Sequence, residues 1–246
     1  MAGHSKWANI RHRKGAQDAK RGKIFTKIIR EITVAARMGG ADVDSNPRLR
    51  DALTKALKAN MKKDTIDNAI KRGAGGLDGA DMIEMRYEGY GPSGVAILVD
   101  CLSDNKNRTV SEVRHAFTKS GGNLGTDGSV AYLFTKQGKI LLSLTNDEDN
   151  LMEAALDAGA EDFSVEEDGY CVTTDGQNYH SVLSSLSKAN FQIENSEIIM
   201  QPSTSINLDI DGAEKLLRMV DLLEELDDVQ DVYTNADIAE EILEKL

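Results

Sequence analysis

The central part of the chain, from Lys139 to Thr174, reads KILLSLTNDEDNLMEAALDAGAEDFSVEEDGYCVTT. The apolar run at 139–144 predicts a strand, and the longer segment at 147–158 predicts a helix. Two short runs at 162–166 and 170–174, separated by an acidic turn, predict a pair of strands.

A helix at 179–188 and a strand at 192–200 are predicted after this stretch. The order strand, helix, strand, strand, helix, strand is the ferredoxin-like unit, complete here in about 65 residues. We assign it to residues 136–204.

The segments on either side of this unit have the same order of predicted elements. Before it come a strand (95–102), a helix (109–119) and a strand (130–134), and after it a strand (206–210), a helix (212–226) and a strand (229–233). We therefore expect a second ferredoxin-like domain made of residues 80–135 and 205–246, with the first domain inserted in its middle. Residues 82–89 alternate as a further strand, and 236–246 predict a last helix.

The first 79 residues have the apolar spacing of helices. A stripe from Ile24 to Ala36 predicts one helix that ends at Gly39-Gly40, and Ser45-Asn46-Pro47 predicts the start of the next. A short third helix is expected at 65–72, followed by a glycine-rich hinge at 73–79. The predicted fold class is α+β and multidomain: a three-helix domain (1–79) and two ferredoxin-like domains, one inserted in the other.

Charge divides the chain at the same place. Residues 1–79 hold 18 Lys/Arg and 8 Asp/Glu, a net +10, whereas the remainder holds 11 and 33, a net −22, giving −12 in total. Nine of the basic residues lie among the first 30, where Asp18 is the one acid. Such a division indicates two bodies with different electrostatic partners.

The basic start of the chain is the candidate site. Cations on an irregular backbone bind phosphate, and an aromatic ring among them can stack on an unpaired base. The predicted nucleic-acid-binding residues are Lys6, Trp7, Arg11, Arg13, Lys14, Lys20, Arg21, Lys23, Lys27 and Arg30. Further basic residues could extend a positive face over the helical domain: Arg48, Arg50, Lys55, Lys58, Lys62, Lys63, Lys71 and Arg72. The alternatives are a clamp onto the chain's own acidic body and a merely solvated surface.

Three polar loops are weaker candidates. GYGPSG (89–94) and SGGNLGTDGS (120–129) run into strands and lack the lysine of a nucleotide-binding loop, which favours ordinary tight turns. SDNKNRT (103–109) precedes a helix that Ser103, Asp104 or Asn107 could cap. Its Lys106 and Arg108 are predicted as a secondary phosphate contact.

Enzyme chemistry has no support in the sequence. No catalytic residue, metal site or cofactor is predicted, and the acids at 221–231 favour a solvated helix face over a cation site. Cys101 and Cys171 lie in apolar runs, as buried thiols of a reducing cytoplasm do. The longest apolar run, VAILV (95–99), is too short for a membrane span. We expect a cytoplasmic, non-enzymatic protein with no membrane partner.

Three segments resemble the YebC family of gene-expression regulators. They are GHSKWANIRHRKGAQDAKRGKIFTKIIREITVAAR (3–37), YEGYGPSGVAILVDCLSDNKNRT (87–109) and GGNLGTDGSVAYLF (121–134). The resemblance implies a helical domain followed by two α+β domains, and the family's usual label implies DNA-binding transcriptional regulation. Its mitochondrial relatives are translational activators of cytochrome oxidase subunit I, which implies RNA instead.

Three functions therefore remain open. The first is a DNA-binding transcriptional regulator, and the second is a translation factor that binds ribosomal RNA or the ribosome. A glycine-broken basic segment with one Trp suits irregular RNA better than a duplex, which is usually read by a recognition helix. The third is a protein-interaction module with a self-docked basic arm. In each of them the acidic α+β domains could face the ribosome or another protein.

Overall fold

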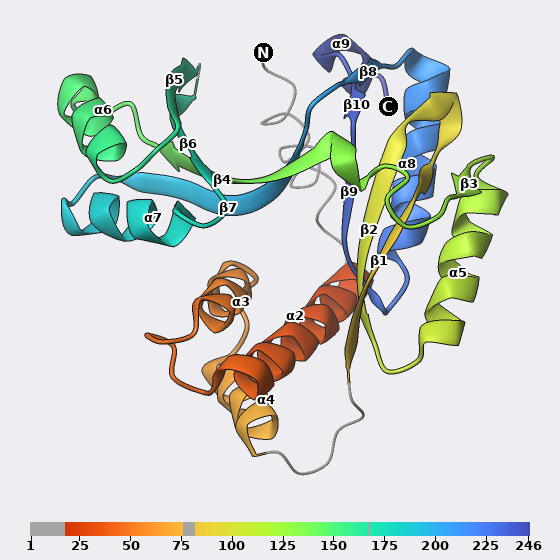
Figure 1. Cartoon of the computed structure of the whole chain (residues 1–246), viewed down its shortest axis with the longest axis horizontal. Coiled ribbons are helices and arrows are strands. Elements are labelled where there is room, and N and C mark those ends of the chain that lie inside the picture. The colour runs from red at the N-terminus through yellow and green to blue at the C-terminus, as the bar shows by residue number, and fades with distance from the viewer. Residues whose placement is uncertain (1–17, 76–81, 167) are drawn as a thin grey trace. The chain divides into compact units, whose positions relative to one another are not determined.

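The computed structural model describes residues 18–75, 82–166 and 168–246, with side chains from Gly22 onward (Figure 1). The chain divides into two compact units. The first covers the chain up to Ala131 and from Thr204 to Leu246, and the second covers Tyr132 to Ser203. Part of the predicted hinge, at 76–79, lies outside the described residues.

Three helices come first among the described residues of the first unit, where the sequence predicts three: α2 (Asp18–Gly39), α3 (Pro47–Lys58) and α4 (Lys63–Ala74). Gly40, with a φ of +85°, follows α2 in the left-handed conformation that ends many helices. Asn46 caps α3, because its side-chain oxygen accepts a hydrogen bond from the Leu49 N–H at 3.0 Å. The helices enclose one core of small and branched residues: Ile28, Ile32, Ala35, Ala36, Leu49, Ala52, Ala56, Met61, Ile66 and Ala69.

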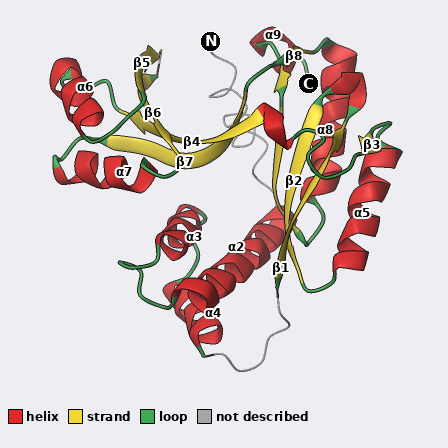
Figure 2. Ribbon diagram, viewed as in Figure 1, coloured by secondary structure: helices red, strands yellow, loops and turns green. Residues whose placement is uncertain are grey.

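The same unit contains a four-stranded antiparallel sheet in the order β3-β1-β2-β9. Its strands are β1 (Ile83–Tyr90), β2 (Ala96–Ser103), β3 (Asn123–Leu124) and β9 (Val229–Thr234). Helices α5 (Lys106–Lys119) and α8 (Ile210–Glu224) cover one face of it (Figure 2). Val99, Phe117 and Leu216, from β2 and the two helices, belong to one buried cluster.

The predicted strand composition of this sheet was wrong in two places. Ala131–Leu133 is a short 3-10 helix, η2, and Phe134 begins a strand of the second unit, so 130–134 is not a strand here. Residues 206–210 supply only β8 (Ile206–Asn207), which pairs with β10 (Ala236–Asp237). The central position belongs to β1, because the tight turn at 91–95 folds it directly back on β2. After β10, the last predicted helix is reduced to α9 (Glu240–Leu243).

The second unit has the predicted ferredoxin-like order. Its elements are β4 (Phe134–Leu142), α6 (Glu148–Asp157), β5 (Asp162–Glu166), β6 (Gly169–Asp175), α7 (Tyr179–Lys188) and β7 (Ile193–Pro202). The sheet order β5-β6-β4-β7 is antiparallel throughout and places the first strand of the unit beside its third and fourth. Ile140, Leu151, Val172 and Leu186 form its core between sheet and helices.

A membrane-spanning helix needs about 20 mostly apolar residues. Among the described helices, none has both this length and this apolar character.

Candidate nucleic-acid interface

The predicted basic segment falls into three parts. Lys6, Trp7, Arg11, Arg13 and Lys14 lie outside the described residues. Lys20 and Arg21 belong to the first turns of α2, and their side chains are likewise outside the description. Their assignment to nucleic acid therefore stays a prediction.

Lys23 and Lys27 lie one helical turn apart on α2 and reach the end of α8. Lys23 Nζ donates to the carbonyl oxygen of Glu225 at 2.8 Å, and Lys27 Nζ donates to that of Glu224 at 2.7 Å. The last carbonyls of a helix lack partners within the helix and carry its negative dipole end. The two lysines therefore cap α8.

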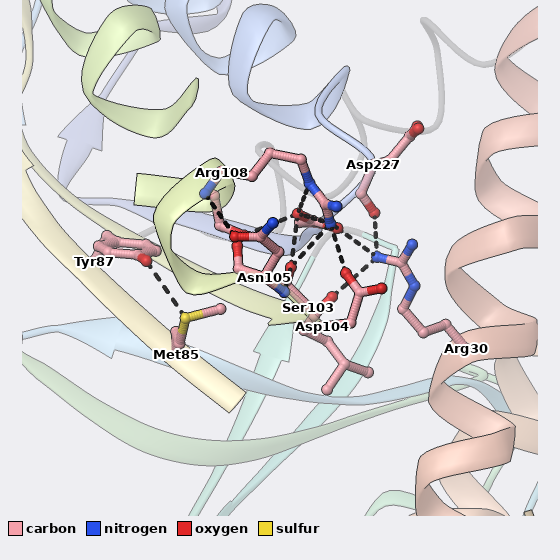
Figure 3. Close-up of polar contacts among 11 residues, drawn as sticks. Arg30, Met85, Tyr87, Ser103, Asp104, Asn105, Arg108 and Asp227 are labelled. Atoms are coloured by element: carbon pink, nitrogen blue, oxygen red, sulfur yellow. Dashed lines mark hydrogen bonds and ion pairs between the residues drawn. The ribbon is translucent and has the colours of Figure 1, made fainter. Parts of the chain in front are cut away.

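Arg30 continues the same side of α2 and enters a polar cluster (Figure 3). Its Nη1 lies 2.9 Å from the Leu102 carbonyl, 2.8 Å from the Asp227 carbonyl and 3.0 Å from Asp228 Oδ1. Only 17% of its side chain is exposed. Arg30 thus links α2 to the end of β2 and to the turn between α8 and β9.

Asp228 is the centre of this cluster and is 2% exposed. Arg108 Nη2 donates to its Oδ2 at 2.7 Å, and the hydroxyls of Ser103 and Thr109 donate to the same oxygen at 2.8 Å. Burial alone would raise the pKa of Asp228, but the hydrogen bonds from Arg108, Ser103 and Thr109 and the charge of Arg108 lower it. The carboxylate is therefore held ionised among its donors.

The loop at 103–109 is shaped by this cluster and by capping. Asn105 caps α5, since its Oδ1 accepts from the Arg108 N–H at 3.0 Å; the predicted caps Ser103, Asp104 and Asn107 were wrong. Ser103 Oγ instead serves Asp228 and accepts from the Asn105 N–H at 3.0 Å. Arg108, predicted as a phosphate contact, also bonds Asp104 at 2.9 Å. Lys106 is exposed at the start of α5, and its phosphate contact stays a prediction.

Not all the basic residues of the helical body share one environment. Arg48 forms a two-point ion pair with Glu31 at 2.6 and 3.0 Å and a second pair with Glu84 of β1. Arg50 donates to the backbone carbonyls of Val43 and Asp44. These two arginines hold the fold together.

Other cations of this body are exposed, and Lys58 in the last turn of α3 is one of them. Lys62 and Lys63 stand at the start of α4, and Lys71 and Arg72 stand in its last turn. Lys55, on α3, is also exposed, but it lies 3.7 Å from Asp231 of β9. Exposed cations on a short, well-packed helix can meet a phosphate backbone without disturbing the core.

Three backbone amides at the end of the second glycine-rich loop are bonded by a side chain of the chain itself. Glu88 of β1, 4% exposed, accepts the N–H groups of Gly128, Val130 and Ala131 at 2.8, 2.8 and 2.7 Å. Burial works to raise the pKa of Glu88, yet these three bonds lower it. The expectation of ordinary turns holds, but sequence reasoning missed Glu88, which is the anchor of the second loop.

The open face of the second unit's sheet was compared with the RNA-binding face of other four-stranded sheets, and its described strands present mainly polar and aliphatic side chains. Strand alternation puts Thr135, Gln137, Lys139 and Leu141 of β4 on the face away from α6 and α7. Phe163, Tyr170 and Tyr179 pack with the core on the helical side. Within the described strands of this sheet no aromatic ring faces outward, so base stacking of the kind seen in four-stranded RNA-binding sheets has no support there.

In the part of the chain that the structure describes, no group of three or more His, Cys, Asp or Glu side chains could hold a metal ion. Cys101 and Cys171 are both buried, and burial raises the pKa of Cys101 to about 12. A thiol with so high a pKa is a poor nucleophile at neutral pH.

Known proteins match this chain over nearly its whole length. Residues 5–76 match the TACO1/YebC protein N-terminal domain, and residues 82–236 match the TACO1/YebC second and third domain. A Legionella pneumophila protein named "Probable transcriptional regulatory protein" is 65% identical over 246 residues, covering 100% of both chains. A Francisella tularensis protein of the same name is 59% identical over 247 residues, again covering 100% of both.

A solved structure also resembles the chain. The crystal structure of a conserved hypothetical protein from Aquifex aeolicus gives a TM-score of 0.78 at 46% sequence identity. The match covers 92% of this chain and 94% of that one.

Proposed function

The chain belongs to the TACO1/YebC family, and we propose that it is a non-enzymatic regulator of gene expression that binds nucleic acid in the cytoplasm. The observation that carries the proposal is the division of charge, with +10 on residues 1–79 against −22 on the remainder. A strongly acidic protein gains affinity for phosphate only where its cations are gathered apart from its acids.

The internal contacts of α2 narrow the proposed contact surface. Lys23, Lys27 and Arg30 are engaged with α8 and Asp228, so we leave them out of it. The surface we propose combines the upstream residues from Lys6 to Arg21 with the exposed cations Lys62, Lys63, Lys71 and Arg72. These contacts support the alternative of a self-docked basic arm for only three of its nine basic residues.

The choice between DNA and RNA rests on different observations. The names of the relatives favour transcription, and so a duplex DNA target. The side of α2 that carries Lys23, Lys27 and Arg30 is used internally, so it does not offer them to a major groove as a recognition helix would. That observation favours the second candidate, a factor that binds structured RNA or the ribosome.

Charge reversal of exposed residues tests the proposal. A variant with Lys62, Lys63, Lys71 and Arg72 changed to Glu is compared with one carrying Lys119→Glu, Lys136→Glu, Lys188→Glu and Lys245→Glu, four exposed lysines elsewhere. Both change the net charge equally. Fluorescence anisotropy with duplex DNA and with single-stranded and hairpin RNA should show loss of binding in the first variant alone. Equal losses would mean that only overall charge matters.

A second pair of measurements separates the targets. The purified protein is sedimented with ribosomes, with and without RNase. If RNA is the target, the wild type should appear in the ribosome pellet and be lost from it after RNase. The variant with Arg11, Arg13, Lys20 and Arg21 changed to Glu should stay in the supernatant. Absence from ribosomes, together with binding to duplex DNA, would support transcriptional regulation.

A further inference from the structure

Most acids of the second unit lie in one stretch of its sequence. Residues 132–203 contain 13 Asp/Glu and 3 Lys, and ten of those acids lie between Asp147 and Asp168 without a single Lys or Arg among them. That segment forms α6 and the edge strand β5, whereas α7 contains serines and no acid. The two helices of one sheet thus face solvent with very different surfaces.

Apolar side chains are exposed within the same acidic segment. Met152 and Leu156, one turn apart on α6, are 39% and 50% exposed, and Val165 of β5 is 57% exposed. Single exposed apolar residues are common, but three in one segment of ten acids need a reason.

The register of β5 and the spacing of α6 place these three residues. Val165 pairs across the ladder with Tyr170 of the core, so its side chain lies on the face of the sheet that α6 and α7 cover. Glu148 precedes Met152 by four residues and therefore lies on the same side of α6. Met152, Leu156 and Val165, together with the exposed acids Glu148, Asp149 and Glu153, lie on two neighbouring elements, and we call this set of residues the α6–β5 seam.

The seam alternates apolar and acidic groups. Asp149 and Glu153 are exposed on α6 beside Met152 and Leu156, at spacings of three and four residues. The apolar groups favour burial against a partner, and the acids decide which partner. Phosphate backbones and a second copy of the same seam are both repelled, whereas a basic chain is attracted. Methionine adapts to varied apolar partners, which suits such a surface.

We propose that the α6–β5 seam binds a lysine- and arginine-rich segment of another protein, one that carries apolar side chains on one face. The apolar face of such a basic amphipathic segment would lie on Met152, Leu156 and Val165, and its cations would meet the acids beside them. It goes beyond the proposed function, because it involves the other unit and a surface that repels nucleic acid.

The probe is a synthetic helical peptide of lysine and leucine with its leucines on one face, compared with a scrambled peptide of the same composition. Anisotropy on the full chain should show tighter binding of the amphipathic peptide. Met152→Gln, Leu156→Gln and Val165→Gln together should weaken it about tenfold or more. Leu144→Gln, at a residue of the same unit that is 49% exposed, should leave it unchanged.

Acid variants test the charge half of the proposal. Asp149→Asn with Glu153→Gln should weaken binding and flatten its salt dependence, whereas Glu194→Gln with Glu197→Gln, exposed acids of β7, should not. Equal binding of the two peptides, or an unaffected apolar variant, would overturn the proposal. So would a gain in peptide affinity after removal of residues 1–17, since the chain's own basic segment would then occupy the seam. Nucleic-acid binding should be unchanged in the apolar variant, which separates this test from that of the proposed function.

Discussion

The guanidinium of Arg30 lies 3.0 Å from the carboxylate of Asp228, 198 residues further along the chain. One partner comes from the N-terminal helices and the other from the turn before β9. Asp228 also accepts bonds from Arg108, Ser103 and Thr109, so a single buried carboxylate joins the helical body to the sheet of the first unit. A charge in such a position is favourable only while all its donors are in place.

Asp228→Asn should therefore destabilise the first unit. The change leaves two guanidinium groups without their shared counter-charge, and we expect a loss of about 3 kcal/mol in the free energy of unfolding. Chemical denaturation followed by circular dichroism measures it. Asp227→Asn is the matched control, because the Asp227 side chain is exposed and Arg30 bonds only the backbone carbonyl of this residue, which the substitution keeps. Equal effects of the two substitutions would contradict the account.

Acid should weaken both the Asp228 cluster and the loop that Glu88 anchors. The pKa values of Asp228 and Glu88 are lowered in the folded chain, so the unfolded chain binds more protons as the pH falls. Their stabilisation is complete above the unfolded pKa, near about 4, and is lost as the pH falls through the folded values. Unfolding free energies measured from about pH 6 to about pH 3 should fall less steeply in Asp228→Asn than in the wild type. Parallel curves would rule out this role for Asp228.

Glu88→Gln should loosen the loop from Gly125 to Ala131. The amide keeps one acceptor oxygen but turns an NH₂ group toward backbone donors, at a cost of about 2 kcal/mol. Hydrogen exchange at Gly128, Val130 and Ala131 should quicken, because these N–H groups bond Glu88. Asp127→Asn, at an exposed residue of the same loop, should leave their exchange rates near those of the wild type.

Gly73 should not tolerate a side chain where α4 packs on α2. A Cβ there would lie 2.2 Å from the Thr33 carbonyl oxygen and 2.9 Å from Ala36 Cβ, so Gly73→Ala must push the helices apart. A loss of about 2 kcal/mol is expected from such overpacking. Gly22→Ala, where nothing lies within 4 Å, should instead stabilise α2 by about 0.5–1 kcal/mol. Thermal unfolding should show a lower melting temperature than the wild type for Gly73→Ala and a higher one for Gly22→Ala.

The sequence predicted local structure well where one signal acted alone. The apolar spacing and caps of α2 and α3 required only neighbouring residues, and the six elements of the second unit follow one another in the chain. The sheet of the first unit was harder to predict, because the inserted unit lies in the sequence between its strands β1 to β3 and its fourth strand, β9. The segment 206–210 has the composition of a strand, but β1 already occupies the place beside β2 that it would need.

The candidate site was predicted only as a composition. Nine basic residues among the first thirty predict phosphate binding. Composition does not show which of these cations instead donate hydrogen bonds to backbone carbonyls of the chain itself. Lys23 and Lys27 bond the last carbonyls of α8, and Arg108 bonds Asp228, only because the tertiary fold brings these distant residues together. Asp228 itself sat within an acidic run at 221–231 that looked uniformly solvated, and nothing in that run marks it as the buried member.

The most direct test of nucleic-acid binding is its dependence on salt. The affinity of the wild-type chain for a labelled RNA hairpin, for single-stranded RNA and for duplex DNA is measured across a salt series. With about five phosphate contacts, log affinity should fall against log salt with a slope near −4.5 for a duplex or near −3.5 for a single strand. A flat response, or no binding at low salt, would contradict the claim that the basic body of this acidic protein binds nucleic acid.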